Sequence, residues 1–204
     1  MTVRLHRGDL PDLSRYTTSV AIDTETMGLN PHRDRLCVVQ LSPGDGSADV
    51  VQIPKGHTDA PNLKALLGNP AVTKIFHFAR FDIAVLYHAL GVMPQPIYCT
   101  KIASRLARTY TDRHGLKDLV RELLSIDLSK QQQSSDWGAD VLSEPQLAYA
   151  ASDVLHLHAL RERLDMMLAR EGRAALAQAC FDFLPHRARL DLQGFEAEDI
   201  FAHS

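Results

Sequence analysis

The chain has 204 residues, of which 45% are hydrophobic and 23% charged, and its formal net charge is −3. This composition supports one domain with a full hydrophobic core and gives no broad positive field for long nucleic acid. The first residues lack an apolar signal region, and no stretch approaches the ~20 apolar residues of a membrane helix, so we expect a cytoplasmic protein with no membrane partner. The three cysteines are widely separated and lack metal-ligand spacing, so we expect buried free thiols.

The predicted elements begin with strands at 19–25, 36–41 and 49–53, and Gly44-Asp45-Gly46 is a hairpin signal between the second and the third. The pattern continues with a helix, a strand, a helix, a short strand and then helices only, at 62–67, 73–78, 80–90 and 97–99 and beyond. A meander followed by alternating helices and strands indicates an α/β fold with a mixed five-stranded sheet flanked by helices. We expect a single domain over 1–204, with 171–204 as a C-terminal helical or tail extension.

Acidic side chains recur at the ends of these elements. Asp23 and Glu25 are two residues apart on the first strand, so both project to the same face. Asp82 lies in the first turn of its helix, where the helix dipole favours a carboxylate. Tyr149 and Asp153 are four residues apart on one helix and therefore share a face.

The helix that carries Tyr149 and Asp153 is predicted over 146–170, and Ser143-Glu-Pro-Gln146 is a candidate capping box at its start. Four clustered carboxylates repel one another unless cations neutralise them. Oxygen ligands without a cysteine or histidine cage favour magnesium or manganese over zinc. The spacing therefore indicates one metal site built from three segments.

Each part of this pattern has an ordinary structural interpretation. Asp-Thr-Glu by itself is more often a strand end than a catalytic motif, Asp82 alone could stabilise a helix start, and Tyr149 could be an amphipathic core residue. An aspartyl-phosphate phosphatase is also a possible interpretation, with Asp49 in its distal metal motif. The hairpin signal beside Asp49 and the Glu at position 25 argue against it.

Taken together, Val20-Ala-Ile-Asp-Thr-Glu-Thr26, His77-Phe-Ala-Arg-Phe-Asp82 and Tyr149-Ala-Ala-Ser-Asp153 resemble the three motifs of a known family. This family is the 3′-to-5′ exonucleases named for their Asp-Glu-Asp-Asp set, in the branch with a tyrosine in the third motif. Lys130-Gln-Gln-Gln-Ser-Ser-Asp-Trp137 also resembles the stretch before the third motif of ribonuclease D proteins. The resemblance covers roughly 16–168, and the chain length is most similar to that of the nanoRNase C group.

The resemblance implies a ribonuclease H-like exonuclease fold and a two-metal mechanism. Asp23, Glu25, Asp82 and Asp153 would hold two divalent cations, Mg²⁺ or Mn²⁺, and Tyr149 would orient the attacking water. The products would be nucleoside 5′-monophosphates.

Further residues are candidate substrate contacts. The segment after the first motif contacts the terminal nucleotide in similar proteins, where an apolar side chain wedges between the last two bases. Phe78 departs from the pattern, because many relatives have Asn there. Arg108 belongs to a set of basic residues at helical spacing, which is more often a solvated face than a phosphate site. The full candidate set is Met27, Gly28, Leu29, His77, Phe78, Arg108 and Trp137.

The sequence leaves the substrate open. Short oligoribonucleotides are the leading prediction, because the weak overall charge offers little binding to long RNA. The alternatives are processing of structured RNA ends, trimming of DNA, and a non-catalytic nucleic-acid-binding module. The apolar residues of 173–204 need a covering surface, and the resemblance implies a closed homo-oligomeric ring larger than a dimer.

Overall fold

The computed structural model describes residues 2–128, 132 and 134–203. Its centre is a six-stranded mixed sheet in the order β1-β4-β3-β2-β5-β6. The strands are β1 (Thr2–Arg7), β2 (Ser19–Thr26), β3 (Leu36–Ser42), β4 (Ser47–Gln52), β5 (Thr73–Phe76) and β6 (Ile97–Cys99). β2, β3 and β4 form an antiparallel meander, while β1 pairs parallel to β4 and β5 pairs parallel to β2 and β6. The hairpin predicted around Asp45 joins β3 to β4 and is confirmed.

The predicted five strands are one too few, because β1 forms an edge strand. Its residues Thr2–Arg7 are mostly exposed or half-buried, so it carries almost no apolar alternation. Pairing with the fully buried β4 and a contact of 2.9 Å between His6 Nε2 and Asp49 Oδ1 hold it in place. Asp49 also accepts from Arg15 and Tyr16, so it serves this edge of the sheet.

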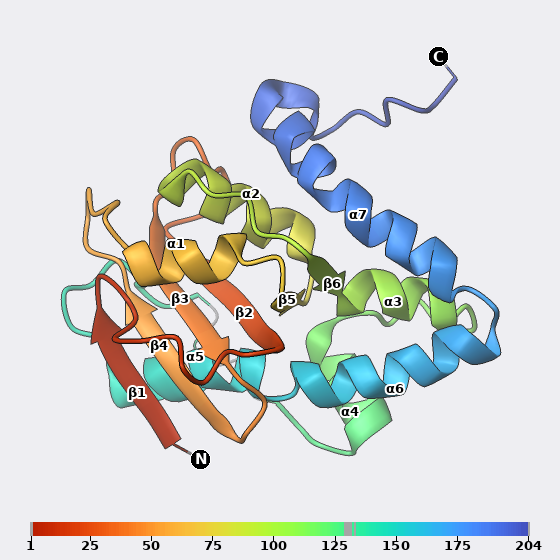
Figure 1. The fold of residues 1–204 in the computed structure, drawn as a ribbon, viewed down its shortest axis with the longest axis horizontal. Helices are drawn as coiled ribbons and strands as arrows, with labels where there is room; N and C mark the ends of the chain where they lie inside the picture. Colours follow the sequence, from red (N-terminus) through yellow and green to blue (C-terminus); the bar gives the residue numbers. More distant parts are fainter. Residues whose placement is uncertain (1, 129–131, 133, 204) are drawn as a thin grey trace.

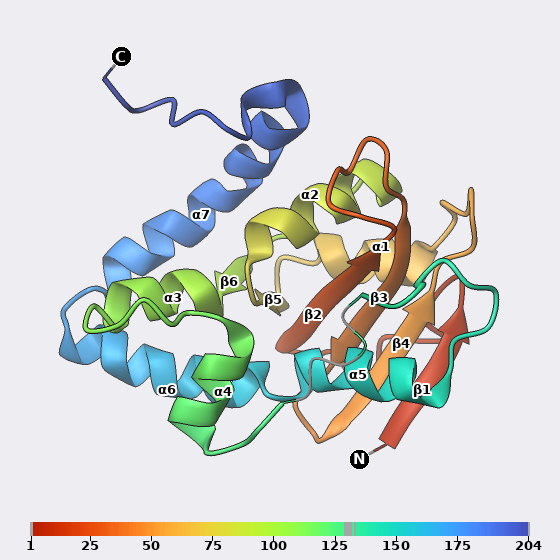
Figure 2. The same cartoon turned by 180° about the vertical axis from the view of Figure 1, so that it is seen from behind.

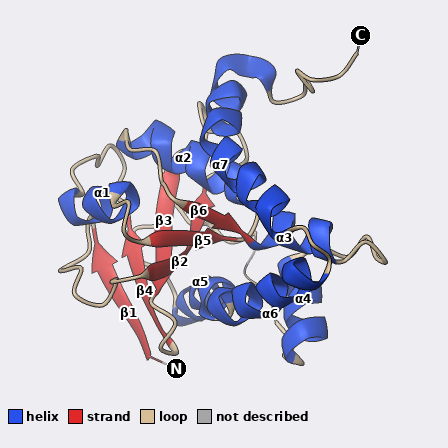
Figure 3. Cartoon of the chain, turned by 45° about the vertical axis from the view of Figure 1, so that its right-hand side comes forward, coloured by secondary structure: helices blue, strands red, loops and turns tan. Residues whose placement is uncertain are grey.

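Helices cover both faces of the sheet. α1 (Pro61–Gly68) and α2 (Ala79–Leu90) lie on one face, and α5 (Glu144–Leu155) crosses the other (Figure 1, Figure 2). Beyond the β5 and β6 edge, α3 (Thr100–Ala107), α4 (Leu116–Leu124) and α6 (Leu157–Arg170) pack together. α7 (Ala174–Leu190) packs on α2 and β6 and ends in the π-helical turn η1 (Asp191–Phe195), from which the chain runs outward to its end (Figure 3).

The prediction of a single helix over 146–170 is wrong. The structure has two helices, α5 and α6, separated at His156, whose φ and ψ of −105° and −4° depart from helical values. The reason is packing, because α5 covers β3 and β4 whereas α6 packs on α3, α4 and β5. A buried apolar side chain on each side of the break keeps the sequence pattern continuous across it.

The interior is apolar along every central element. Among the largest fully buried apolar side chains are Ile22, Leu41, Leu63, Ile75, Phe76, Ile83 and Leu119. All three cysteines are free; Cys37 and Cys99 are buried, as predicted, whereas Cys180 is only half-buried because it lies on the partly exposed α7. In the described part of the chain, none of the helices is long and apolar enough to cross a membrane. The cytoplasmic location stays a prediction.

Candidate active site

The site is built on β2, in the middle of the sheet. Because strand side chains alternate, Asp23 and Glu25 project to one face while Ile22 and Thr24 project to the other. Asp23 and Glu25 each offer one oxygen that lies within 4.8 Å of an oxygen of Asp153 from α5, and of each other. Three carboxylates from two elements thus converge on a volume the size of a cation site.

Asp82 lies in the first turn of α2, outside this group of three, and is almost fully buried. Its charge nevertheless acts on Asp23 and Glu25. α2 starts after Phe78, a non-glycine residue in the left-handed conformation with φ of 68°. Backbone strain of this kind gathers at functional sites. Thr24 Oγ1 donates to Asp82 Oδ1 at 2.7 Å and fixes its orientation.

α5 presents Tyr149 and Asp153 to the site. The predicted capping box starts this helix: Gln146 N donates to Ser143 Oγ, and Gln146 Oε1 accepts from Ser143 N at 3.0 Å. Tyr149 packs on the buried Trp137, with 6.1 Å between the ring centroids. The firm helix start and the indole together set the position of the tyrosine hydroxyl.

Burial is the main electrostatic feature of the cluster. Burial, followed by repulsion from the neighbouring carboxylates, raises the pKa of Asp23 well above its usual range and that of Glu25 to about 8. Burial raises the pKa of both Asp82 and Asp153 to about 7. Burial and the same carboxylates also raise the pKa of Tyr149, so its hydroxyl stays protonated. A bound cation would relieve this repulsion.

Two residues of the site, Gln40 and Thr24, were not predicted. Gln40 lies on β3 directly opposite Asp23, and its Nε2 donates to Asp23 Oδ2 at 2.9 Å and more weakly to Glu25 Oε1 at 3.5 Å. The available signal was a polar residue inside the otherwise apolar run 36–41. For Thr24 there was no signal beyond its place between two ligands.

Asp23, Glu25 and Asp153 face a cleft of about 330 Å³. The start of α4 closes it on one side, through Gly115, Leu116 and Lys117. His77 also lines this cleft. Thr100 Oγ1 donates its only proton to the Phe76 carbonyl at 3.2 Å, so at 2.9 Å it accepts from His77 Nδ1.

Burial, and to a smaller extent Lys101, lowers the pKa of His77 to about 3. The ring is therefore neutral. Since Nδ1 carries the proton, Nε2 is left as a hydrogen-bond acceptor.

Four of the predicted substrate contacts lie at the surface beside the cleft. Met27 and Leu29 are exposed, Phe78 is about half exposed, and Lys101 Nζ lies 4.4 Å from the Phe78 ring centroid. Gly28 is half-buried against Asp34, and a Cβ on Gly28 would come within 2.4 Å of Asp34 Oδ2. The turn therefore needs glycine at this position and aims Leu29 outward.

The other two predicted substrate contacts, Arg108 and Trp137, are buried. Arg108 is fully buried, donates to Ser104 Oγ at 2.9 Å and to the Arg113 carbonyl at 2.8 Å, and pairs with Glu122. A buried guanidinium with these partners cannot act as the predicted phosphate contact. That prediction is wrong, and Arg108 has a structural role.

Trp137 is also buried, in a small apolar cluster under α5. It supports Tyr149 rather than presenting a face to substrate. Within the stretch that precedes it, Lys130, Gln131 and Gln133 lie outside the described residues.

Comparison with known proteins agrees with this geometry. A family model described as a 3′-5′ exonuclease matches residues 10–169. Ribonuclease D from Acidiphilium cryptum is 40% identical over 154 residues, which is 76% of this chain and 39% of the relative. The chain thus spans well under half the length of that relative.

Solved structures extend the similarity to the whole chain. NrnC from Brucella melitensis with bound Mg²⁺ has a TM-score of 0.97 and 63% identity, and the same nuclease bound to pGG has 0.98 and 64%. Both comparisons cover 100% of both chains. Escherichia coli RNase D, an exoribonuclease involved in structured RNA processing, has a TM-score of 0.77 and 28% identity over 86% of this chain and 46% of its own.

Proposed function

Because the chain belongs to the 3′-5′ exonuclease family, we propose that it hydrolyses short oligoribonucleotides, including dinucleotides, to nucleoside 5′-monophosphates. The observation that carries this proposal is the convergence of Asp23, Glu25 and Asp153 in one open cleft that Tyr149 also lines. The full-length similarity to NrnC, a nuclease solved with pGG, supports the short substrate. We treat 1–204 as one exonuclease domain, with 171–204 as its C-terminal extension.

The donor set fits two divalent cations, Mg²⁺ or Mn²⁺. The ligands are hard carboxylate oxygens, and their raised pKa values mark a site that gains from added positive charge. Asp23, Glu25, Asp82 and Asp153 would hold the cations, which supply an activated nucleophile and stabilise the leaving oxygen of a phosphodiester. NrnC, the similar nuclease, has been solved with bound Mg²⁺.

The protein's own groups set the geometry of the reaction. Tyr149, protonated and braced by Trp137, orients the attacking water from the α5 side. Gln40 holds the oxygens of Asp23 and Glu25 toward the cleft. Met27, Gly28, Leu29, Phe78 and the acceptor Nε2 of His77 contact the terminal nucleotide.

Two other classes of substrate could be hydrolysed by the same metal-dependent reaction. The similarity to E. coli RNase D favours processing of structured RNA ends as the second candidate, and DNA trimming uses the same metal site. A non-catalytic nucleic-acid-binding module is disfavoured, because a binding site for a polyanion gains nothing from four carboxylates.

A length series tests the proposal. RNA and DNA labelled at the 5′ end, from dinucleotides upward, are incubated with the intact chain in Mg²⁺ or in EDTA. We expect kcat/KM to be highest for the shortest RNAs and hydrolysis to stop in EDTA, with Asp153→Asn as the inactive control. An efficiency that rises toward structured RNA, or an equal rate on DNA, would favour the corresponding alternative.

We also propose that the chain assembles into a homo-oligomeric ring larger than a dimer. Part of the predicted apolar stripe, Phe181 and Leu184, packs on the chain's own core. Other apolar side chains of the extension are exposed, namely Leu176, Phe183, Phe195, Ile200 and Phe201. Large apolar groups gathered on one extension favour a neighbouring subunit as their cover.

A further inference from the structure

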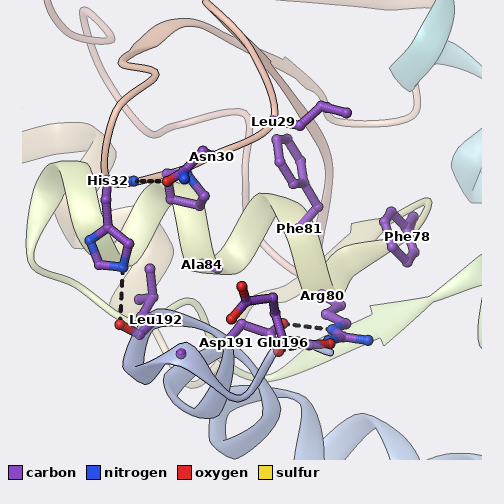
Figure 4. Close-up of a pocket in the computed structure, with 12 residues that line it drawn as sticks. Leu29, Asn30, His32, Phe78, Arg80, Phe81, Ala84, Asp191, Leu192 and Glu196 are labelled. Carbon is purple, nitrogen blue, oxygen red and sulfur yellow. Dashed lines mark hydrogen bonds and ion pairs between the residues drawn. The ribbon is translucent and has the colours of Figure 1, made fainter. Parts of the chain in front are cut away.

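A pocket of about 170 Å³ lies at the ends of β1 and β4, where the segment 137–140 passes them on its way to α5 (Figure 2). It is separate from the larger cavity at the start of α2 (Figure 4), where Leu29 and Phe78 already belong to the proposed substrate surface. The residues that line this pocket and those that line the catalytic cleft do not overlap. The proposed hydrolysis therefore does not explain it.

The pocket has an excess of positive charge. Arg7, Arg35 and Lys55 line it, and Asp140 is the single acid among its described lining residues. None of the three cations has an ion-pair partner in the described part of the chain. Because the whole chain carries a net charge of −3, such a local excess is a preferred place for an anion.

The walls of the pocket are tied together without any ligand. Arg35 Nη1 donates to the Ile53 carbonyl at 3.0 Å, and Arg35 Nη2 donates to the Gly138 carbonyl at 3.3 Å. Gln52 Nε2 donates to the Ala139 carbonyl at 2.9 Å. These carbonyls hold the guanidinium in place but do not neutralise its charge. The pocket is thus preformed around one fixed cation.

The indole of Trp137 adds a hydrogen-bond donor to this environment. Trp137 lines the pocket and is 3% exposed. Its Nε1 is buried and has no hydrogen-bond partner among the described residues. Buried N–H groups are nearly always bonded, so an acceptor held in the pocket would explain this donor. Cations together with N–H donors suit an oxyanion.

The volume limits the size of the ligand. Pockets for drug-sized molecules measure about 300–1,000 Å³, so a pocket of about 170 Å³ is too small for a whole nucleotide. It has room for a single phosphate group. Arg7 and Lys55 are exposed at its rim, so both side chains can turn toward such a group.

The same walls support the active site from behind. Trp137 packs on Tyr149, with 6.1 Å between the ring centroids. Gly138 lies against Met27, since a Cβ on Gly138 would come within 2.4 Å of Met27 Sδ. The Arg35 carbonyl accepts from Met27 N at 3.1 Å. An anion that draws the two rim cations onto this segment would therefore restrain the supports of the catalytic tyrosine.

We propose that this pocket binds a phosphate-sized oxyanion, either inorganic phosphate or the phosphate group of a nucleotide, and that its occupancy raises activity by bracing Trp137 against Tyr149. The anion site stands independently of the proposed hydrolysis, because its binding can be measured without substrate. The effect on activity rests on the proposed exonuclease function. A better-positioned hydroxyl raises kcat rather than lowering KM.

A binding experiment tests the site in the intact chain. Trp137 is the single tryptophan of the sequence, so its fluorescence reports on the pocket directly. Inorganic phosphate or sulfate is titrated in EDTA at constant ionic strength, since the metal-free carboxylates of the cleft repel anions. Calorimetry measures the same Kd independently. We expect saturable binding of both anions to the wild-type protein.

Single charge removals identify the pocket as the place of binding. Arg7→Gln and Lys55→Gln should each weaken Kd about tenfold, the size of one lost hydrogen bond to a charged group. Both positions are exposed, so Tm should not change. Arg163→Gln removes an exposed charge of α6 and should bind as wild type. Absence of binding by both methods, or equal affinity in all four proteins, would overturn the site.

The source of the phosphate group is resolved by competition. A nucleoside 5′-monophosphate that displaces inorganic phosphate, with an affinity that also falls in Lys55→Gln, identifies a nucleotide as a ligand of the pocket. A nucleotide that does not displace it leaves the free oxyanion as the ligand. The parent nucleoside lacks the charged group, and displacement of phosphate by it would contradict an oxyanion site.

Kinetics with a ribodinucleotide in Mg²⁺ test the effect on activity. Replacing chloride by sulfate at equal ionic strength should raise kcat about fivefold, at the low end of the coupling between two sites. The rise should be lost in Lys55→Gln and in Tyr149→Phe and kept in Arg163→Gln. An unchanged kcat in a wild type that binds sulfate would overturn the coupling to Tyr149. A wild type that binds the anion but hydrolyses no RNA contradicts the proposed function instead.

Discussion

Hydrogen bonds from Thr24 and Gln40 hold three of the four carboxylates in place. Thr24 donates to Asp82, and Gln40 donates to Asp23 and Glu25, so neutral groups fix the oxygens without adding positive charge. Asp153 is positioned instead by α5, whose start is fixed by its capping box. The proposed metal ligands are therefore positioned before any cation binds, although their charges repel one another.

Tyr149→Phe is the sharpest test of a single group at the site. It removes only the hydroxyl that we propose orients the attacking water, and it keeps the ring packed on Trp137. We expect kcat to fall about 100-fold or more with Mg²⁺ affinity nearly unchanged. Steady-state kinetics and a Mg²⁺ titration measure this, with Asp153→Ala as the variant that loses both activity and metal affinity. An unchanged kcat would reduce Tyr149 to a packing residue.

Gly28→Ala tests the turn that aims Leu29. A Cβ would lie 2.4 Å from Asp34 Oδ2, and Asp34 cannot easily retreat, because Arg33 and the Asn30 amide hold it. We expect a loss of about 1–3 kcal/mol in the free energy of unfolding, as for overpacked sites, together with a raised KM. Gly68→Ala is the matched control, since its Cβ would meet only Val92 at an ordinary 3.5 Å. Equal stability of the two variants would contradict this account.

Spacing in the sequence identified the residues that the structure gathers at β2, α2 and α5, because strand and helix periodicity fix which side chains share a face. It could not place Arg108. A basic residue at helical spacing with Lys101 and Arg105 reads as a surface charge, and only the tertiary structure brings Ser104, the Arg113 carbonyl and Glu122 around it.

At the scale of elements, periodicity located every central strand but missed β1 and the break at His156. An exposed edge strand has no buried face to set an alternating pattern. The break lies between α5, which packs on the sheet, and α6, which packs on α3 and α4. The apolar pattern of the sequence continues through it. Both failures concern packing partners that are distant in sequence.

Arg108 also links two elements to the active site. It ties the segment after α3 to α4, and the start of α4 lines the catalytic cleft through Gly115 and Lys117. Arg108→Met leaves Ser104 Oγ and the Arg113 carbonyl with fewer partners, so we expect a loss of about 1–3 kcal/mol in stability and a lower kcat/KM. Denaturant unfolding and kinetics in a salt series measure both. Unchanged stability and an unchanged kcat/KM would contradict this structural role of Arg108.

At the scale of the whole molecule, the acidic cluster should make stability depend on pH when metal is absent. In the folded protein the pKa is about 8 for Glu25 and about 7 for Asp82 and Asp153, whereas unfolded carboxyl groups titrate near pH 4. Between these values the folded state binds more protons, so the free energy of unfolding falls as pH rises from about 4 to 8.

Thermal melting in EDTA at pH 5.5 and pH 8 measures this dependence. We expect a lower Tm at pH 8, and we expect Mg²⁺ to remove most of the difference because it replaces the protons. Asp153→Asn in EDTA should show a shallower dependence, since one repelling charge is gone. A Tm that rises with pH in EDTA would contradict the raised pKa values.

The proposed assembly depends on the exposed aromatic residues of the C-terminal extension. Phe183 and Phe201 lie with their ring centroids 5.8 Å apart, and Phe201 remains largely exposed on the extension. If these groups are covered by a neighbouring subunit, removing them weakens association without disturbing the core, because Phe181 and Leu184 already bury the inner side of α7.

We therefore expect light scattering to give a mass above that of a dimer for the intact chain. Ile200→Ser with Phe201→Ser should give a smaller particle of unchanged Tm at high dilution, and Met166→Ser should keep the full mass. Truncation after Glu198 should act like the double variant, because it removes both Ile200 and Phe201. A monomeric intact chain would refute the ring, and a full-size assembly after truncation would place the interface on other surfaces.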